Sequence, residues 1–465
     1  MSKGNAFAYL ILFVWPLFSI WLYRHKSIQV ATLVTIVGGF MILPVKTFVD
    51  FPLIPPLGKH SMPVLAAIIG CWLIKNQKIK YFANKGLLQI LVIALFLGAF
   101  ITAELNTDRI ILVGKFLPAL TIHDAISAVV AIFLSVTPFF IGKQFFRTYQ
   151  DQLLMFRFLA IAGLIYSIPI LYEIRMSPQL HTQFYGYFPH SFAQQRRGDG
   201  FRAVVFMGHG LLVAFFAVCV LTAMVTLGEI KEKIKNYSPN ALSYYLLIVL
   251  VLCKSKAALL YGLFTFVLIK KIGYKKQLKI AVLLAMLTLF YPTMSIMKVF
   301  PHQQISELAE SYLGPERAQS LVFRFNNELI LLEHARKRFF FGWGGWGRNR
   351  VYSKETGGDI SVTDGKWILS FGTAGFIGFL AEFGLLAISV FRAKTAAKFI
   401  KDKKQQTLLA AHALLVSIIM VDQIPNASLS PWLWLIVGGL LGRSETIIAQ
   451  SKKQLTKQPL NIQSS

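Results

Sequence analysis

Apolar runs of roughly 20 residues recur along the whole of this chain, and no other feature constrains its fold as strongly. A run of that length forms a helix that crosses the hydrocarbon core of a bilayer, about 30 Å thick. Only 15% of the 465 residues are charged, whereas soluble domains have about 25%. We therefore expect an all-α, polytopic membrane protein, with residues 1–465 in a single integral membrane domain.

The runs predict about 13 transmembrane helices. The expected spans lie near residues 6–23, 28–45, 61–74, 87–103, 124–142, 153–172, 203–227, 241–253, 256–269, 278–297, 367–391, 406–421 and 430–442.

The basic residues between the spans predict the orientation. The positive-inside rule explains most of the net charge of +27, so nucleic-acid binding is not expected. The cluster Arg24-His25-Lys26 follows the first apolar run, so a cleavable signal is not expected. Lysine-rich loops fall on one side, which is then cytoplasmic, at 24–26, 75–85, 143–147, 231–235, 270–279, 394–404 and the C-terminal tail. The N-terminus is expected outside.

Arginine is distributed differently from lysine. Five of the sixteen arginines fall on or near the inside, and the other eleven are expected outside: Arg109, Arg175, Arg196, Arg197, Arg202, Arg317, Arg324, Arg336, Arg338, Arg348 and Arg350. External loops normally lack basic residues. The planar, permanently charged guanidinium group binds phosphate well, so these eleven arginines predict a phosphate-binding site. Contacts with lipid headgroups or nearby acids remain the alternative for any single arginine.

Two external segments are long, at 173–202 and 298–366. The second is expected to cap the outer face, with an amphipathic helix over 316–338 followed by a glycine- and tryptophan-rich loop at 339–348. Within that helix, Arg324 can pair with Glu328 by helical spacing, which does not exclude a functional role. Asp364 lies where the chain is expected to re-enter the membrane. It can be a functional carboxylate or the N-cap of the following helix.

Other classes of site find little support. No HExxH, GxSxG, P-loop or CxxC pattern occurs, so neither a metal nor a cofactor is expected. Cys71, Cys219 and Cys253 are expected to be small buried hydrophobic residues. Acidic residues inside the spans are almost absent, which disfavours an ion-coupled transporter.

The order of several short motifs over roughly residues 190–440 resembles the bacterial O-antigen polymerase and O-antigen ligase superfamily, closest to its exopolysaccharide polymerases. The matching pieces are Arg197-x-x-Gly200-Phe201-Arg202, Cys253-Lys254-Ser255-Lys256-Ala257-Ala258-Leu259-Leu260, Glu333-His334-Ala335 leading into Phe341-Gly342-Trp343-Gly344, Asp364-Gly365-Lys366-Trp367-Ile368 and the Gly375–Gly378 helix. The family often has arginine where this chain has Lys256. Its ligases often have histidine where this chain has Asp364, which favours the polymerase.

The resemblance implies a metal-independent glycosyltransferase of the bacterial inner membrane, with its active site facing outward. It would polymerise polyprenyl-diphosphate-linked oligosaccharide repeats into a surface polysaccharide, and preorganised cations would stabilise the leaving diphosphate. A ligase that moves the glycan onto a lipid core is one alternative, and a lipid-linked-glycan flippase or transporter is another. Membrane lipids, a flippase and chain-length regulator proteins are the further expected partners.

The candidate residues follow from this chemistry. Asp364 is the first choice of general base, before His209 and His334. Arg202 and Lys256 are expected to act in catalysis. The expected diphosphate-binding residues are Arg196, Arg197, Arg324, Arg336, Arg348 and His209.

Overall fold

The chain folds into a bundle of helices joined by short hairpins. The computed structural model describes residues 3–51, 54–82, 86–198, 200–313 and 315–457. The bundle helices are α1 (Ala6–His25), α2 (Ile28–Leu33), α3 (Gly39–Ile42), α4 (Ser61–Ile69), α5 (Leu87–Glu104), α6 (Ile122–Phe145), α7 (Tyr149–Met176), α9 (Gly210–Glu229), α10 (Pro239–Leu252), α11 (Lys256–Lys271), α12 (Tyr274–Ile296), α15 (Lys366–Ala396), α16 (Lys403–Asp422) and α17 (Pro431–Lys457). π-helical turns at Val34–Gly38 and Gly70–Ile74 join α2 to α3 and extend α4.

Within the described ranges, nine helices are long and apolar enough to cross a membrane: α1, α5, α6, α7, α9, α12, α15, α16 and α17. The apolar segments Ile28–Ile42, Ser61–Ile74 and Pro239–Leu252 are shorter, and α11 has 16 residues. The prediction of an all-α, multi-pass membrane protein is therefore confirmed. Helices form at all thirteen expected positions, but thirteen crossings remain a prediction.

The core is built around α9, whose side chains are the most completely buried of any of these helices. Close packing of α6 against α17 depends on glycine. A Cβ atom at Gly142 would lie 2.4 Å from the Leu435 carbonyl oxygen, and one at Gly442 would lie 2.2 Å from that of Lys143. Small residues let helix backbones approach in this way, and the resulting van der Waals contact holds helices together within a membrane.

Loops that the charge pattern assigns to one side contact one another. At the predicted outer end, Asn5 donates its main-chain N–H to Tyr185, and Lys59 donates to the Phe206 carbonyl. At the opposite end, Lys143 forms an ion pair with Glu445 at 3.2 Å. These contacts each join segments that the charge pattern assigns to the same side, and the sidedness of the loops remains a prediction.

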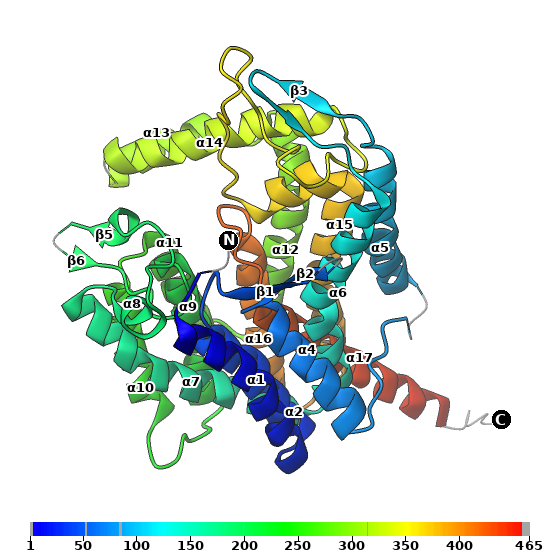
Figure 1. Ribbon diagram of the computed structural model, residues 1–465. Helices are drawn as coiled ribbons and strands as arrows, with labels where there is room; N and C mark the ends of the chain where they lie inside the picture. The colour runs from blue at the N-terminus through cyan, green and yellow to red at the C-terminus, as the bar shows by residue number, and fades with distance from the viewer. Residues whose placement is uncertain (1–2, 52–53, 83–85, 199, 314, 458–465) are drawn as a thin grey trace.

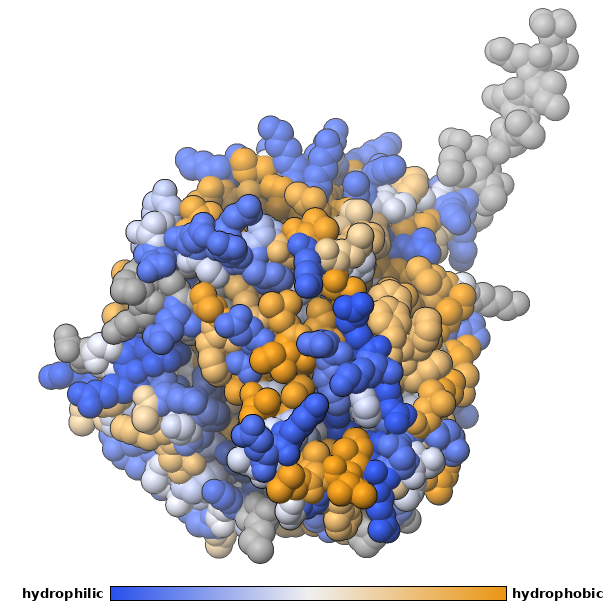
Figure 2. Space-filling model, turned by 90° about the horizontal axis from the view of Figure 1, so that it is seen from above, coloured by the Kyte–Doolittle hydropathy of each residue, from blue (hydrophilic) through white to orange (hydrophobic). Residues whose placement is uncertain are grey.

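Hairpins and two further helices cover the predicted outer end (Figure 1). The three antiparallel hairpins join β1 (Phe48–Phe51) to β2 (Ile54–Gly58), β3 (Ile110–Leu112) to β4 (Lys115–Leu117), and β5 (Arg196–Arg197) to β6 (Gly200–Phe201). Helices α13 (His302–Leu313) and α14 (Pro315–Arg336) run across the top, and α8 (Leu180–Tyr185) lies near β5 and β6. Seen from above, this face carries many hydrophilic side chains with apolar patches between them (Figure 2).

The predicted span at 367–391 is not one continuous helix. Gly375 has a φ of 69° and divides α15 into two parts. The glycine-rich loop satisfies the backbone groups that this break frees, because Phe376 N donates to Phe339 O and Trp343 N donates to Gly372 O. A Cβ atom at Gly375 would lie 2.3 Å from the Phe340 carbonyl oxygen, so glycine is required there.

The predicted span at 203–227 also begins later, at Gly210. Glu173, at the end of α7, accepts the main-chain N–H groups of Val204 and Val205, each at 2.7 Å. Val205 has a left-handed φ of 46°. These contacts hold residues 203–209 in an extended turn instead of a helix, and they fix the position of the preceding Arg202.

Candidate functional site

Arg202 and Lys254 come from separate loops and meet at the predicted outer end of the bundle. Arg202 directly follows β6, is 7% exposed, and donates from Nε to the Lys254 carbonyl at 3.1 Å. Lys254 donates from Nζ to the Arg197 carbonyl at 3.2 Å. A Cβ atom at Gly200 would lie 2.4 Å from Lys254 Nζ, so this glycine makes room for the lysine. Three cationic residues thus gather where β5, β6 and the start of α11 meet.

The lysine beside Arg202 is Lys254 and not Lys256, the candidate catalytic lysine. Lys256 is exposed at the first position of α11, whereas Lys254 has a left-handed φ of 51° that turns its side chain toward the β5–β6 hairpin. The catalytic role expected of Lys256 stays a prediction, and the structure adds Lys254 as the lysine that contacts the Arg202 loop.

The positive charges of this cluster act on His209. Burial first, and then the positive charges of His190, Arg202, Arg197 and Arg324, lower its pKa to about 4. Its Nδ1 accepts the Leu211 N–H at 3.0 Å, so His209 caps α9 as a neutral ring with its proton on Nε2. We call Arg197, Arg202, Lys254 and Arg324 the cationic cluster.

Asp364 is joined to this cluster by Arg324. The Arg324 Nε lies 3.4 Å from Asp364 Oδ2, and both side chains are about one-third exposed. Arg324 also donates to the Pro425 carbonyl at 3.3 Å. The N-cap of α15 is Gly365, not Asp364, so the alternative capping role is not observed. Arg324 therefore pairs with Asp364 and not with Glu328, its partner by helical spacing.

Glu328 is a site residue that the sequence analysis missed. It lines a small pocket together with Arg324 and Asp364. Burial raises the pKa of Glu328 to about 7, although a hydrogen bond from the Tyr291 hydroxyl at 2.9 Å opposes the shift. A carboxyl group that titrates near neutral pH can exchange a proton with a substrate hydroxyl. Its position four residues after Arg324 had suggested only a surface ion pair.

Arg348 is not available to a phosphate, because its guanidinium is completely buried and donates to the carbonyls of Asp108 and Pro118. It also pairs with the Asp108 carboxylate at 3.1 Å. The prediction that it binds diphosphate is therefore wrong: Arg348 ties the glycine-rich loop to the β3–β4 hairpin. Arg338 and Arg350 pair with Asp108 and Asp359 in the same way.

The remaining predicted residues lie apart from these contacts. Arg196 and Arg336 are exposed. His334 binds the Arg348 carbonyl at 2.8 Å and stacks on Trp343, with ring centroids 4.4 Å apart. It therefore has a structural role. Arg317 lies among residues whose side chains are outside the described set.

A cavity of about 580 Å³ opens beside the first part of α15. An ion pair lies in its wall, with Lys366 Nζ 3.0 Å from Glu382 Oε1, and Ser370 donates to the same carboxylate. Glu382 is an acidic residue within a predicted span and was not among the candidate residues. Leu95, Ala99, Ala128, Ile132 and Val136 give the rest of this cavity a largely apolar lining.

Among the described residues, no group of three or more His, Cys, Asp or Glu side chains could hold a metal ion. The three cysteines are free and buried, as predicted. No family model matches this chain, and no curated protein matches it either. Fold and site together define an all-α, multi-pass membrane protein with a cationic cluster next to a carboxylate at one end of its bundle.

Proposed function

We propose that this protein polymerises polyprenyl-diphosphate-linked oligosaccharide repeats at the outer face of the bacterial inner membrane. Two contacts carry the proposal: Lys254 joins Arg197 and Arg202, and Arg324 pairs with Asp364. The charges of all three arginines also lower the pKa of His209, after burial. Glycosyl transfer from a lipid diphosphate develops negative charge on the leaving oxygen. Fixed cations in a partly buried site stabilise that charge without reorganisation.

In this mechanism a hydroxyl group of one lipid-linked glycan attacks the anomeric carbon of another. The anomeric C–O bond to the diphosphate breaks, and the diphosphate leaves within the cationic cluster. Asp364 takes the proton of the attacking hydroxyl, and the Arg324 guanidinium orients the carboxylate. Glu328, whose pKa is about 7, lines the same pocket as Arg324 and Asp364.

The experiment is incubation of the purified full chain with lipid-linked repeats, followed by separation of the products by length. A polymerase gives a ladder, a ligase gives a single transfer onto an added lipid core, and a flippase makes no new glycosidic bond. Asp364→Asn is the matched inactive variant, because the amide keeps the shape but takes no proton. Absence of a ladder from the wild-type chain would overturn the proposal.

A further inference from the structure

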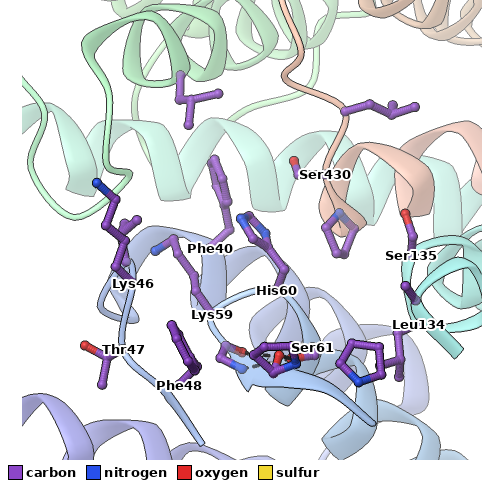
Figure 3. A pocket seen from close by; sticks show the side chains of 18 of the residues that line it. Phe40, Lys46, Thr47, Phe48, Lys59, His60, Ser61, Leu134, Ser135 and Ser430 are labelled. Atoms are coloured by element: carbon purple, nitrogen blue, oxygen red, sulfur yellow. Dashed lines mark hydrogen bonds between the residues drawn. The ribbon is translucent and has the colours of Figure 1, made fainter. Parts of the chain in front are cut away.

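A second site lies apart from the cationic cluster, in a cavity of about 420 Å³ near the β1–β2 hairpin (Figure 3). Its walls come from Phe40, residues 45–48, 55–56 and 58–61, α6, the first turn of α9 and residues 427–431. None of Arg197, Arg202, Lys254, Arg324 or Asp364 lines it. Its polar groups are therefore unused by the mechanism above.

Lys59 is a buried lysine in this wall. It is 5% exposed, donates from Nζ to the carbonyls of Leu43 and Phe206, and lies over the Phe40 ring at 5.5 Å. Among the described residues, no carboxylate lies within ion-pair distance of it. Burial accordingly lowers the pKa of Lys59 well below its usual range. A buried charge of this kind is costly unless an opposite charge accompanies it.

Other groups around Lys59 also suit an anion. Lys46 and His60 line the same cavity, and their nitrogen atoms extend in the same direction as Lys59 Nζ (Figure 3). Ser430 is 5% exposed, and its buried hydroxyl has no hydrogen-bond partner in the structure. Helix α17 begins directly after Ser430, so the positive end of its dipole faces this region.

The cavity borders an apolar space. It shares Pro55, Pro56, Ala131 and Ser135 with the cavity of about 580 Å³, whose lining is largely apolar along α5 and α6. A ligand with a charged head and a hydrocarbon chain fits the two together, whereas a free anion would use only the first.

We propose that the Lys59 cavity binds the phosphate group of a membrane lipid, with its chain in the adjoining apolar cavity. Lys59 Nζ supplies the charge, and the Lys46 ammonium and the Ser430 hydroxyl supply further donors. The proposal is independent of the proposed polymerase function, because it concerns binding at residues outside the cationic cluster.

The test is a titration of the detergent-purified full chain, followed by native mass spectrometry. The probes are didecanoyl phosphatidic acid, the matching phosphatidylcholine and inorganic phosphate. We expect saturable binding of phosphatidic acid, and a loss of roughly tenfold or more in affinity for Lys59→Gln, as removal of a charged hydrogen bond causes. Lys115→Gln is the matched control, since Lys115 is exposed on β4 away from the cavity.

Equal affinity of Lys59→Gln and wild type for phosphatidic acid would overturn the proposal. Inorganic phosphate that binds as tightly as the lipid, or phosphatidylcholine that binds as tightly as phosphatidic acid, would overturn the assignment to a lipid phosphate. If Lys59→Gln fails to fold, the affinity of Ser430→Ala for phosphatidic acid tests the proposal instead, because this variant removes only the unpartnered hydroxyl. Unchanged affinity in that variant contradicts the site, and a several-fold loss supports it.

Discussion

Lys366 and Glu382 form an ion pair at 3.0 Å although they belong to the same helical element, α15. In a straight helix, residues sixteen positions apart are separated by about 24 Å. The pair therefore requires the two parts of α15 to fold toward each other at Gly375. Lys366 also lines the apolar cavity, and Asp364, two residues earlier, pairs with Arg324.

Gly375→Ala should destabilise the protein by about 2–4 kcal/mol. Alanine is strained at a φ of 69°, and its Cβ would press on the Phe340 carbonyl. Gly345→Ala, in the neighbouring loop, is the control, because its Cβ would meet no atom within 4 Å. The measurement is thermal unfolding in detergent. Equal melting temperatures for the two variants would show that the break does not need glycine.

Glu328 should make stability depend on pH. Its pKa is about 7 in the folded protein and about 4.3 when unfolded. The folded state therefore binds the proton more tightly, and the stabilisation is complete below about pH 4.3 and is lost as the pH rises through 7.

Glu328→Gln should remove this dependence. Because Glu328 is partly exposed, we expect wild type to lose about 1–3 kcal/mol more than the variant between pH 5 and 8. The measurement is urea or thermal unfolding of both proteins across that range. Glu333→Gln, at an exposed position of the same helix, is the control. Parallel curves for wild type and Glu328→Gln would contradict the raised pKa.

Orientation can be tested by cysteine labelling, because Cys71, Cys219 and Cys253 are at most 2% exposed and do not compete. We expect an impermeant reagent to label Gln183→Cys and Gln303→Cys in intact cells, since both lie in segments predicted to be external. Lys233→Cys should react only after lysis. The reverse pattern would place the cationic cluster on the cytoplasmic side and remove its access to an externally presented glycan.

The two lysines of the 253–256 loop should differ in importance. Lys254→Ala removes the contact with the Arg197 carbonyl beside Arg202, and we expect polymer formation to fall roughly tenfold. Lys256→Ala alters an exposed side chain and should have a much smaller effect. The measurement is the initial rate of product formation at matched protein levels. A larger loss for Lys256→Ala would support the catalytic role expected of Lys256 from the sequence.

The sequence predicted the helices well and the site only in part. Apolar runs locate helices because length and hydropathy are properties of the segment itself. The break at Gly375 was missed because a glycine within an apolar run is equally compatible with a straight helix. The role of Lys254 depends on a left-handed backbone residue, and the roles of Arg348 and Glu328 depend on contacts with Asp108 and Tyr291, which are distant along the chain.

The most direct test of the central claim is the rate of ladder formation by Arg202→Ala. The account assigns the leaving diphosphate to the cationic cluster, so this rate should fall by roughly 10²-fold or more. Arg202→Lys should also be poor, because lysine lacks the bidentate fork. Arg109→Ala, an exposed arginine over the Phe116 ring of the β3–β4 hairpin, should retain the wild-type rate. Near-normal ladder formation by Arg202→Ala at normal membrane levels would contradict the account.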